Sequence, residues 1–436
     1  MQTKRIAAIA AVMLAVQAVL PLNAAAANVN DVQHLVKTLT TNGAMTTADD
    51  FNGDGIINAV DLTLMKRAVI AEAHSDTGEL RTQTVTAITE QTKLIGRTLT
   101  KNGVTWLVHS GSAVECTVTG TEASVTIAGD NSINSSAKYR PRYGVYVDGT
   151  LIKDVVMGEK EQIVKLFSGT EKRTATVKVM HLSEANNGAI GVKQFDVTSS
   201  AAKPVQPTAK KDLMIEFVGD SITCAYGVGA ASQNEGFETG TEDFSKSYAY
   251  LAAQMLDADY SAVSYSGYGV ISGYTGDGNI NAGSLVPPVY ENVAKFGDYA
   301  VPWDFASHPV DVVFINLGTN DDSYAKHALA TRAKEYQANY LAFLKQVRQC
   351  NPDAAIVCTL GIMGCQELYP YLEAAVKEFG DAKTSCYESP SQNMADGLGA
   401  DWHPSPVTHE KNAYLAAEQI SKALGIPFDA EQKAAE

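Results

Sequence analysis

The sequence has few charged residues, and one sign of charge dominates among them. Charged side chains make up 19% of the 436 residues, and the formal net charge is -15. An acidic chain is a poor partner for nucleic acid or for an anionic membrane, so we expect neither. The 45% hydrophobic content is still enough for substantial cores, and the length predicts two or three domains.

Long hydrophobic runs are missing everywhere except at the start of the chain. Lys4 and Arg5 precede an apolar run from Ile6 to Leu22, and Ala25 to Ala27 offer small residues for cleavage. This pattern is typical of a secretory signal peptide, which we assign to residues 1–27. No later segment approaches the roughly 18 apolar residues that a membrane span requires. We therefore expect a secreted, soluble protein.

Two motifs that are common in enzymes are also missing. The six cysteines show no C-x-x-C spacing, which argues against a zinc site. No G-x-S-x-G occurs, which argues against the nucleophile elbow of an α/β-hydrolase. A serine nucleophile would have to stand in another local motif.

The sequence pattern changes once along the chain. Many short runs rich in Val, Thr and Ile between Val85 and Val197 predict a β-sandwich or jelly roll, assigned to residues 84–200. Residues 199–211 have the Pro, Ala and Lys composition of a linker. Alternating strands and helices then predict a three-layer α/β domain with a parallel sheet, at residues 212–428. The expected strands are Met214–Val218, Ser261–Tyr265, Val310–Leu317 and Ala355–Leu360, and the expected helices are Tyr248–Met255, Ala328–Arg348, Tyr371–Phe379 and Asn412–Leu424.

Four short polar blocks in this second half carry the chemistry. They are Gly219-Asp220-Ser221-Ile222-Thr223, Ser266-Gly267, Gly318-Thr319-Asn320-Asp321 and Asp401-Trp402-His403-Pro404. The first and third directly follow apolar runs that predict buried strands, and open α/β sheets place their ligand sites at that edge. A serine, amide donors and a late histidine beside an acid are the components of acyl transfer.

These blocks suggest individual roles. Ser221 is the expected nucleophile and His403 the expected base, while the backbone N–H of Gly267 and the amide of Asn320 are expected to bind the oxyanion. Asp401 stands two residues before the histidine. Either this carboxylate or a nearby backbone carbonyl could fix the ring, and both alternatives stay open.

Aromatic residues near these blocks could bind sugar rings. Tyr274 lies in a glycine-rich loop and is the first choice, and Trp303 and Trp402 are further candidates. An aromatic face offers an apolar platform to a sugar, although each ring could equally serve ordinary packing.

A calcium loop is expected near the amino terminus. Oxygen donors stand at loop positions 1, 3, 5, 9 and 12, with a backbone carbonyl at position 7: Asp50, Asn52, Asp54, Asn58 and Asp61, with Ile56 supplying the carbonyl. The loop and the helix that follows it resemble a dockerin, assigned to residues 28–73. The segment from Asp31 to Lys37 matches only the helix of a first repeat. The resemblance implies bound calcium and a cohesin partner on a cellulosome scaffold.

From Thr84 to Pro427 the chain resembles the SGNH (GDSL-type) esterases, and in particular carbohydrate esterase family 2. The four polar blocks carry the likeness, together with the stretches Arg142 to Gly149 and His181 to Asn186 of the expected sandwich. The resemblance implies removal of acetyl groups from plant polysaccharides such as xylan and glucomannan, with no cofactor for catalysis. A lipase or thioesterase on the same fold, or an inactive carbohydrate-binding protein, remain the alternatives.

Overall fold

The computed structural model describes residues 29–41, 49–51, 56–73 and 76–428. The chain divides into two compact units, one formed by residues 1–79 with 200–203, and the other by residues 80–199 with 204–436. No helix among the described residues is long and apolar enough to cross a membrane.

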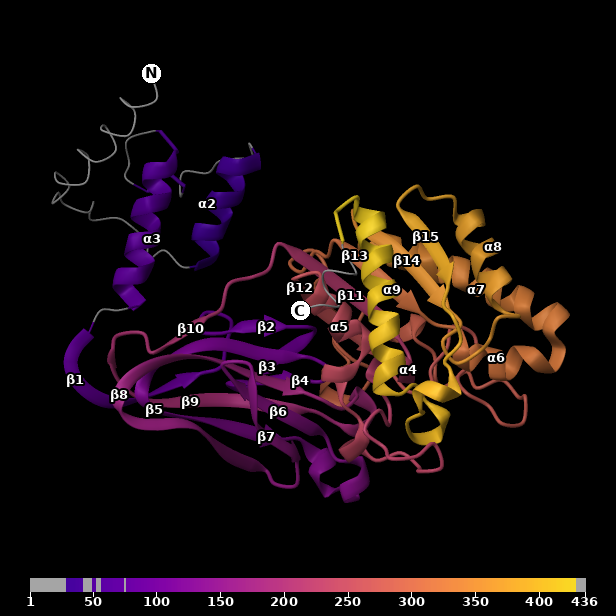
Figure 1. Cartoon of the computed structure of the whole chain (residues 1–436), viewed down its shortest axis with the longest axis horizontal. Helices are drawn as coiled ribbons and strands as arrows, with labels where there is room; N and C mark the ends of the chain where they lie inside the picture. Colours follow the sequence, from indigo (N-terminus) through magenta and orange to yellow (C-terminus); the bar gives the residue numbers. More distant parts are fainter. Residues whose placement is uncertain (1–28, 42–48, 52–55, 74–75, 429–436) are drawn as a thin grey trace. The chain divides into compact units, whose positions relative to one another are not determined.

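In the described part of the first unit lie the helices α2 (Val29–Thr41) and α3 (Ala59–Ala73) (Figure 1). They pack against each other, and Leu35 and Met65 are its buried apolar residues among those described.

The second unit begins with an antiparallel β-domain, residues 80–207. Its ten strands form one hydrogen-bonded sheet with the order β3-β4-β9-β5-β8-β6-β7, to which β1, β2 and β10 are joined. The long strands β5 and β8 pair along most of their length and contain register shifts that bend the sheet. The strands are β1 (Asp76–Thr86), β2 (Lys93–Ile95), β3 (Thr98–Lys101), β4 (Val104–Leu107), β5 (Ala113–Gly129), β6 (Arg142–Val147), β7 (Thr150–Val156), β8 (Glu161–His181), β9 (Ile190–Ala201) and β10 (Val205–Pro207).

The predicted linker is not an unstructured connector. Strand β9 continues to Ala201, and β10 pairs antiparallel with β5, so that Val205 is buried beside Val118. Lys93 donates a hydrogen bond of 2.9 Å to the carbonyl of Ala209. The composition is that of a linker, but the burial of Val205 and its pairing with β5 fix this segment. The β-domain and the α/β domain accordingly share one compact unit.

The α/β domain has a five-stranded parallel sheet with the order β12-β11-β13-β14-β15 (Figure 1). Its strands are β11 (Leu213–Gly219), β12 (Ala258–Ser264), β13 (Val312–Asn316), β14 (Ala355–Leu360) and β15 (Thr384–Glu388). Its helices are α4 (Ser221–Cys224), α5 (Tyr248–Met255), α6 (Thr319–Ala325), α7 (Leu329–Cys350), α8 (Tyr369–Phe379) and α9 (Pro406–Leu424).

The central strands are apolar on both faces because helices cover both. Along β13, Val312 and Phe314 pack into the core formed with α5 and α9, whereas Val313 and Ile315 pack into the core formed with α7 and α8. Successive strand residues point to opposite faces, so a continuous apolar run is what a doubly covered strand requires. The prediction of a three-layer α/β domain with a parallel sheet is confirmed.

A buried ion pair joins the β-domain to the sheet of the α/β domain. Arg97 is fully buried, and its guanidinium donates to both carboxylate oxygens of Glu216 on β11 at 3.0 and 3.1 Å. The same guanidinium donates to the backbone carbonyl of Asn292 at 2.7 Å and to that of Tyr290. Since the guanidinium of Arg97 donates these hydrogen bonds to the other domain, this residue fixes how the two domains pack.

Candidate active site

Three of the expected site residues follow the carboxyl ends of three neighbouring strands. Ser221 is the first residue of α4, directly after β11, while Gly267 follows β12 and Asn320 lies in α6 after β13. Because β12 and β13 flank β11 in a parallel sheet, their carboxyl ends lie at the same edge. The carboxylate of Asp220 accepts a hydrogen bond of 3.0 Å from the Ile222 N–H and so caps the turn that carries the serine.

The structure brings Ser221 and His403 into hydrogen-bond contact. The serine Oγ lies 2.9 Å from His403 Nε2, although the two residues are far apart in the sequence. His403 stands between the short helix η11 (Ala400–Trp402) and α9, whose first turn is capped by Ser405. A nucleophile within reach of a base is the arrangement that activates a serine.

A backbone carbonyl, and not Asp401, orients the imidazole. His403 Nδ1 lies 3.0 Å from the carbonyl oxygen of Ala400, which requires the proton on Nδ1 and leaves Nε2 free to accept. Asp401 has a left-handed backbone, with φ 48°, and its carboxylate accepts a hydrogen bond of 2.7 Å from the Tyr226 hydroxyl. Of the two alternatives, the contacts in the structure match the backbone carbonyl, because the carboxylate of Asp401 turns toward Tyr226.

Tyr226 supports the base from one side. Its ring stacks on the imidazole of His403 with centroids 4.1 Å apart, and Phe237 stacks behind it at 4.4 Å. Burial lowers the pKa of His403 to about 4, opposed by the hydrogen bond to Ala400 and by the negative charge of Asp401. The imidazole is thus neutral at pH 7, as a general base must be. Nothing in the local sequence of Tyr226 indicates that its ring contacts the histidine.

The expected oxyanion donors are Gly267, on the loop after β12, and Asn320, in α6. Gly267 has φ +81°, and a side chain built there would meet no atom within 4 Å, so space lies open beside its backbone. Asn320 Nδ2 donates to the Tyr268 carbonyl at 2.8 Å and makes a longer contact of 3.4 Å with Asp220. One hydrogen of the Asn320 amide therefore bonds the loop that contains Tyr268. The other makes only the long contact with Asp220, which a substrate oxygen could replace.

Asp321 anchors the loop that follows Gly267. Its buried carboxylate accepts hydrogen bonds from the backbone N–H groups of Val270, Ile271 and Ser272, at 2.7 to 3.1 Å. Burial raises the pKa of Asp321 to about 6 although these three donors favour its charged form. The block that starts at Gly318 thus positions the Gly267 loop as well as contributing Asn320.

The three expected sugar-binding aromatic residues differ in their surroundings. Tyr274 is 64% exposed, and its backbone N–H donates to the carbonyl of Gly267 at 2.8 Å. Trp402 is 52% exposed and precedes His403 in the chain. Trp303 instead packs over the guanidinium of Arg97 and against His308.

Residues of the β-domain also reach this site. The carboxylate of Glu184 accepts a hydrogen bond of 2.7 Å from the N–H of Ser266, the residue before Gly267. Asn186 donates to the Ser266 carbonyl at 3.3 Å. Both belong to the stretch that carried the family resemblance of the sandwich, but nothing in their local sequence indicated that they contact the oxyanion loop.

The expected calcium ligands are only partly within the described residues, because Asn52 and Asp54 lie outside them. Asp61 is fully buried at the start of α3, and its carboxylate accepts a hydrogen bond of 2.9 Å from the Asn58 N–H. The Asn58 side chain donates to the Ile56 carbonyl at 3.0 Å, which closes a tight turn. These oxygen donors fit a hard cation by their chemistry. Among the described residues no group of three acidic, histidine or cysteine side chains converges as a metal site.

Comparison with protein families assigns both parts of the second unit. The model of the GDSL-like lipase/acylhydrolase family matches residues 217–411, and the carbohydrate esterase 2 N-terminal model matches residues 94–207. The first match includes Ser221 and His403, and the second includes most of the β-domain.

The chain is also similar to individual proteins. A cellulase/esterase of Acetivibrio thermocellus is 33% identical over 329 residues, which are 72% of this chain; the chain spans only 37% of that protein's length. An acetylxylan esterase / glucomannan deacetylase of Cellvibrio japonicus is 25% identical over 289 residues, or 64% of this chain and 76% of that protein. The structure of a family two carbohydrate esterase from Clostridium thermocellum, in complex with cellohexaose, is 30% identical with a TM-score of 0.66 and covers 77% of this chain and 99% of its own.

The fold and the paired serine and histidine define a carboxylic ester hydrolase of the serine type. The match to the solved esterase over its whole length decides the family. The chain belongs to carbohydrate esterase family 2.

Proposed function

We propose that this protein is a secreted esterase that removes O-acetyl groups from plant cell-wall polysaccharides such as xylan and glucomannan. The observation that carries the proposal is the 2.9 Å contact between Ser221 Oγ and His403 Nε2, beside the open backbone of Gly267. An ester carbonyl in that space meets a nucleophile, a neutral base and an N–H donor together.

In the first half of the reaction Ser221 attacks the acetyl carbonyl, and His403 Nε2 takes the hydroxyl proton. The carbonyl of Ala400 holds the Nδ1 proton, so the imidazolium keeps its orientation. The oxyanion is stabilised by the N–H groups of Ser221 and Gly267 and by Asn320. His403 then protonates the sugar alkoxide as it leaves. Removing one such donor typically costs a factor of about 100 to 1000 in kcat.

In the second half a water molecule replaces the sugar. His403 takes a proton from the water, and the resulting hydroxide attacks the acetyl group on Ser221. The same donors stabilise the second oxyanion, and His403 returns the proton to the serine as acetate leaves. Every proton is carried by these residues, so the cycle needs no further group from the chain.

The surroundings favour a sugar over a lipid as the alcohol part of the ester. Tyr274 and Trp402 are exposed; the backbone of Tyr274 is bonded to Gly267, and Trp402 precedes His403 in the chain. Two aromatic faces with polar edges suit the apolar faces and hydroxyl rim of a sugar. The relatives named above are carbohydrate esterases, which supports the same substrate class.

A direct test is acetate release from acetylated xylan and acetylated glucomannan by the wild-type protein and by Ser221→Ala. We expect release by the wild type only. A lipase or thioesterase would prefer long-chain esters or acyl thioesters over these polymers. Polysaccharide binding without release of acetate would identify a carbohydrate-binding protein with an inactive site.

The proposal extends to the amino-terminal unit. We infer that residues 28–73 form a dockerin-like module that binds calcium and docks onto a cohesin, and that residues 1–27 direct export. The buried carboxylate of Asp61 and the closed turn at Asn58 support the loop. Calorimetric titration of the full chain with Ca²⁺ tests it, with Asp61→Ala expected to lose binding. Acetate release from a small ester should be the same in both proteins.

A further inference from the structure

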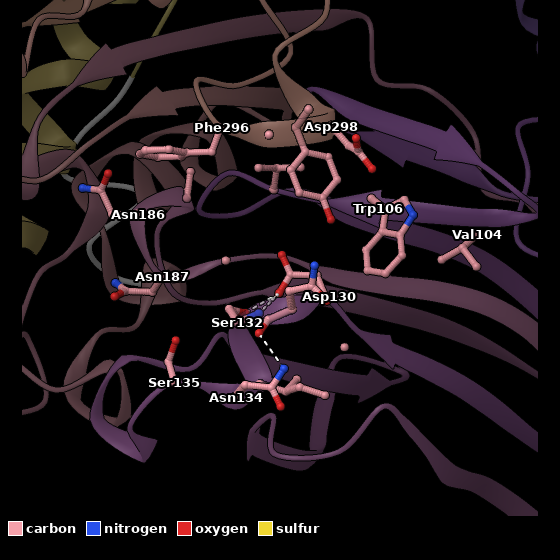
Figure 2. Close-up of a pocket in the computed structure, with 18 of the residues that line it drawn as sticks. Val104, Trp106, Asp130, Ser132, Asn134, Ser135, Asn186, Asn187, Phe296 and Asp298 are labelled. Carbon is pink, nitrogen blue, oxygen red and sulfur yellow. Dashed lines mark hydrogen bonds between the residues drawn. The ribbon is translucent and has the colours of Figure 1, made fainter.

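A cavity of about 810 Å³ lies where the β-domain meets a loop of the α/β domain. That volume falls within the range of ordinary ligand sites. Figure 2 shows the loop with Phe296 and Asp298 on one side, the turn with Asp130, Ser132 and Asn134 opposite it, Asn186 and Asn187 at one end and Trp106 at the other. Both domains therefore supply walls.

The lining combines aromatic rings with neutral polar groups. Trp106 and Tyr299 contact each other at a tilt, with centroids 6.1 Å apart, and Phe296 is partly exposed. Amide and hydroxyl side chains surround them, including Asn134 and Asn186. Aromatic platforms bind the C–H faces of sugars, and amides pair with sugar hydroxyls.

The charges in the cavity balance one another. Its lining holds two lysines and two aspartates. Lys101 and Asp298 form an ion pair at 3.0 Å. Asp130 accepts hydrogen bonds from the backbone N–H groups of Ser132 and Ala189 at 2.9 and 3.0 Å. A balanced lining of this kind suits an uncharged ligand better than a polyanion.

One end of the cavity adjoins the catalytic loop. Asn186 lines the cavity, and its Nδ2 donates to the carbonyl of Ser266, next to Gly267. We propose that the cavity binds an uncharged glycan chain beyond the sugar whose ester is cleaved, so that the β-domain forms part of the polysaccharide site. This inference rests on the proposed function.

The test uses Phe296→Ala and Trp106→Ala in the full chain. One lost aromatic contact should raise KM for acetylated glucomannan about 3- to 10-fold, with no change for 4-nitrophenyl acetate. Ile163→Ala is the matched control, since it removes a 70% exposed apolar side chain of the β-domain, to which Trp106 also belongs, at a place outside the cavity. Phe296 lies on a partly exposed loop, so its replacement spares the core even if that of Trp106 does not.

Calorimetry with unacetylated glucomannan oligosaccharides on a Ser221→Ala background separates the two proposals. Weaker binding by the cavity variants supports the site, whatever the turnover. Equal binding and equal KM for the wild type, the control and both variants would overturn it. An absence of acetate release from polymer by the wild type would instead count against the proposed function.

A separate set of hydrogen bonds indicates that the β-domain also aligns the oxyanion donor. The carbonyl of Ser266 and the N–H of Gly267 belong to one planar peptide, in which the two bonds point in opposite directions. Asn186 Nδ2 holds the carbonyl at 3.3 Å, and the Glu184 carboxylate holds the preceding N–H of Ser266 at 2.7 Å. Fixing this peptide fixes the direction of the Gly267 N–H.

Glu184 is itself held firmly. Its carboxylate also accepts a hydrogen bond of 2.8 Å from the side-chain amide of Asn186, and its backbone N–H donates one of 3.0 Å to the carboxylate of Glu242. The thiol of Cys224, in the helix that begins with Ser221, lies 3.9 Å from the same carboxylate. Burial raises the pKa of Glu184 and of Glu242, and the charge of Glu184 raises that of Glu242 further. The hydrogen-bond donors around Glu184 act against this rise in its pKa and favour its charged form.

We infer that Asn186 and Glu184 are positioning residues that align the Gly267 N–H for transition-state binding. Asn186 is exposed, so Asn186→Ala should leave the fold intact. We expect kcat on 4-nitrophenyl acetate to fall about tenfold with KM unchanged, because the oxyanion exists only in the transition state. Affinity for a phenylboronic acid, which forms a tetrahedral adduct with the serine, should fall in parallel.

Asn186→Asp gives a stricter version of the test. It keeps the size of the side chain but replaces the N–H donor by a carboxylate, which repels the Ser266 carbonyl, so its kcat should be at least as low. Asn339→Ala is the control, since it removes an exposed amide on α7 whose partner is a carbonyl of the same helix. Wild-type kcat and boronate affinity in both Asn186 variants would refute the inference.

Discussion

Replacing Asp401 by asparagine tests whether His403 works without an acid. Asparagine keeps the size of the side chain and an oxygen that can accept from the Tyr226 hydroxyl, but it removes the charge. The Nδ1 partner is the carbonyl of Ala400, which this substitution does not touch. The tautomer and the ring orientation should therefore persist.

The expected loss is small and can be bounded. Asp401 is exposed, and an exposed charge contributes about 0.2–1 kcal/mol to a pair with another charge. Removing it should lower kcat about two- to fivefold, through weaker stabilisation of the imidazolium. In serine proteases, loss of a true triad aspartate costs about 10⁴-fold because the wrong tautomer forms. The two mechanisms differ by more than three orders of magnitude.

Initial rates with 4-nitrophenyl acetate at pH 7 measure the effect. Asp401→Ala beside Asp401→Asn separates the charge from the hydrogen bond to Tyr226, and Ser221→Ala sets the background. A fall of a thousandfold or more in Asp401→Asn, with unchanged thermal unfolding, would refute the dyad and show that the carboxylate turns to the ring during turnover.

Two further predictions follow from burial. Arg97→Ala leaves Glu216 buried without its charge partner and should lower the free energy of unfolding by about 3–5 kcal/mol. Lys101→Ala removes a partly exposed ion pair with Asp298 and should lower it by less than about 1 kcal/mol. Equal melting temperatures for the two variants would contradict this prediction. Since burial lowers the pKa of His403 to about 4, kcat/KM should stay nearly constant down to about pH 5.5, and a midpoint near the ordinary value of 6.5 would contradict the neutral buried imidazole.

The layers of the α/β domain could be predicted because its strands are apolar on both faces. The expected strand Ala355–Leu360 and helix Tyr248–Met255 have the observed bounds. Strand β15 was missed, since Thr384 to Glu388 is an edge strand with polar residues and no apolar run. The short helices α4 and α6 were also missed, because their four and seven residues are too few to show a periodic apolar pattern.

The sequence also identified the chemical groups of the site, but not their contacts. Ser221 and His403 follow recognisable motifs, and the structure places them together. For the orienting group the sequence left the Asp401 carboxylate and a nearby backbone carbonyl as alternatives, and it could not single out Ala400 because every residue has such a carbonyl. Trp303 was proposed as a sugar-binding residue because it is an aromatic residue in the same part of the sequence as the motifs. In the structure its ring packs on the guanidinium of Arg97.

The role of the β-domain depends on contacts that no sequence pattern carries. Arg97 fixes the domain against β11, the strand that leads to the nucleophile. Glu184 and Asn186 reach the peptide before Gly267 from the same domain. An α/β domain separated from these residues would keep its serine and histidine but lose the groups that hold one oxyanion donor. On the alignment proposed above, the β-domain contributes to the enzyme's active site and is more than an attached binding module, because catalysis depends on the alignment of such donors.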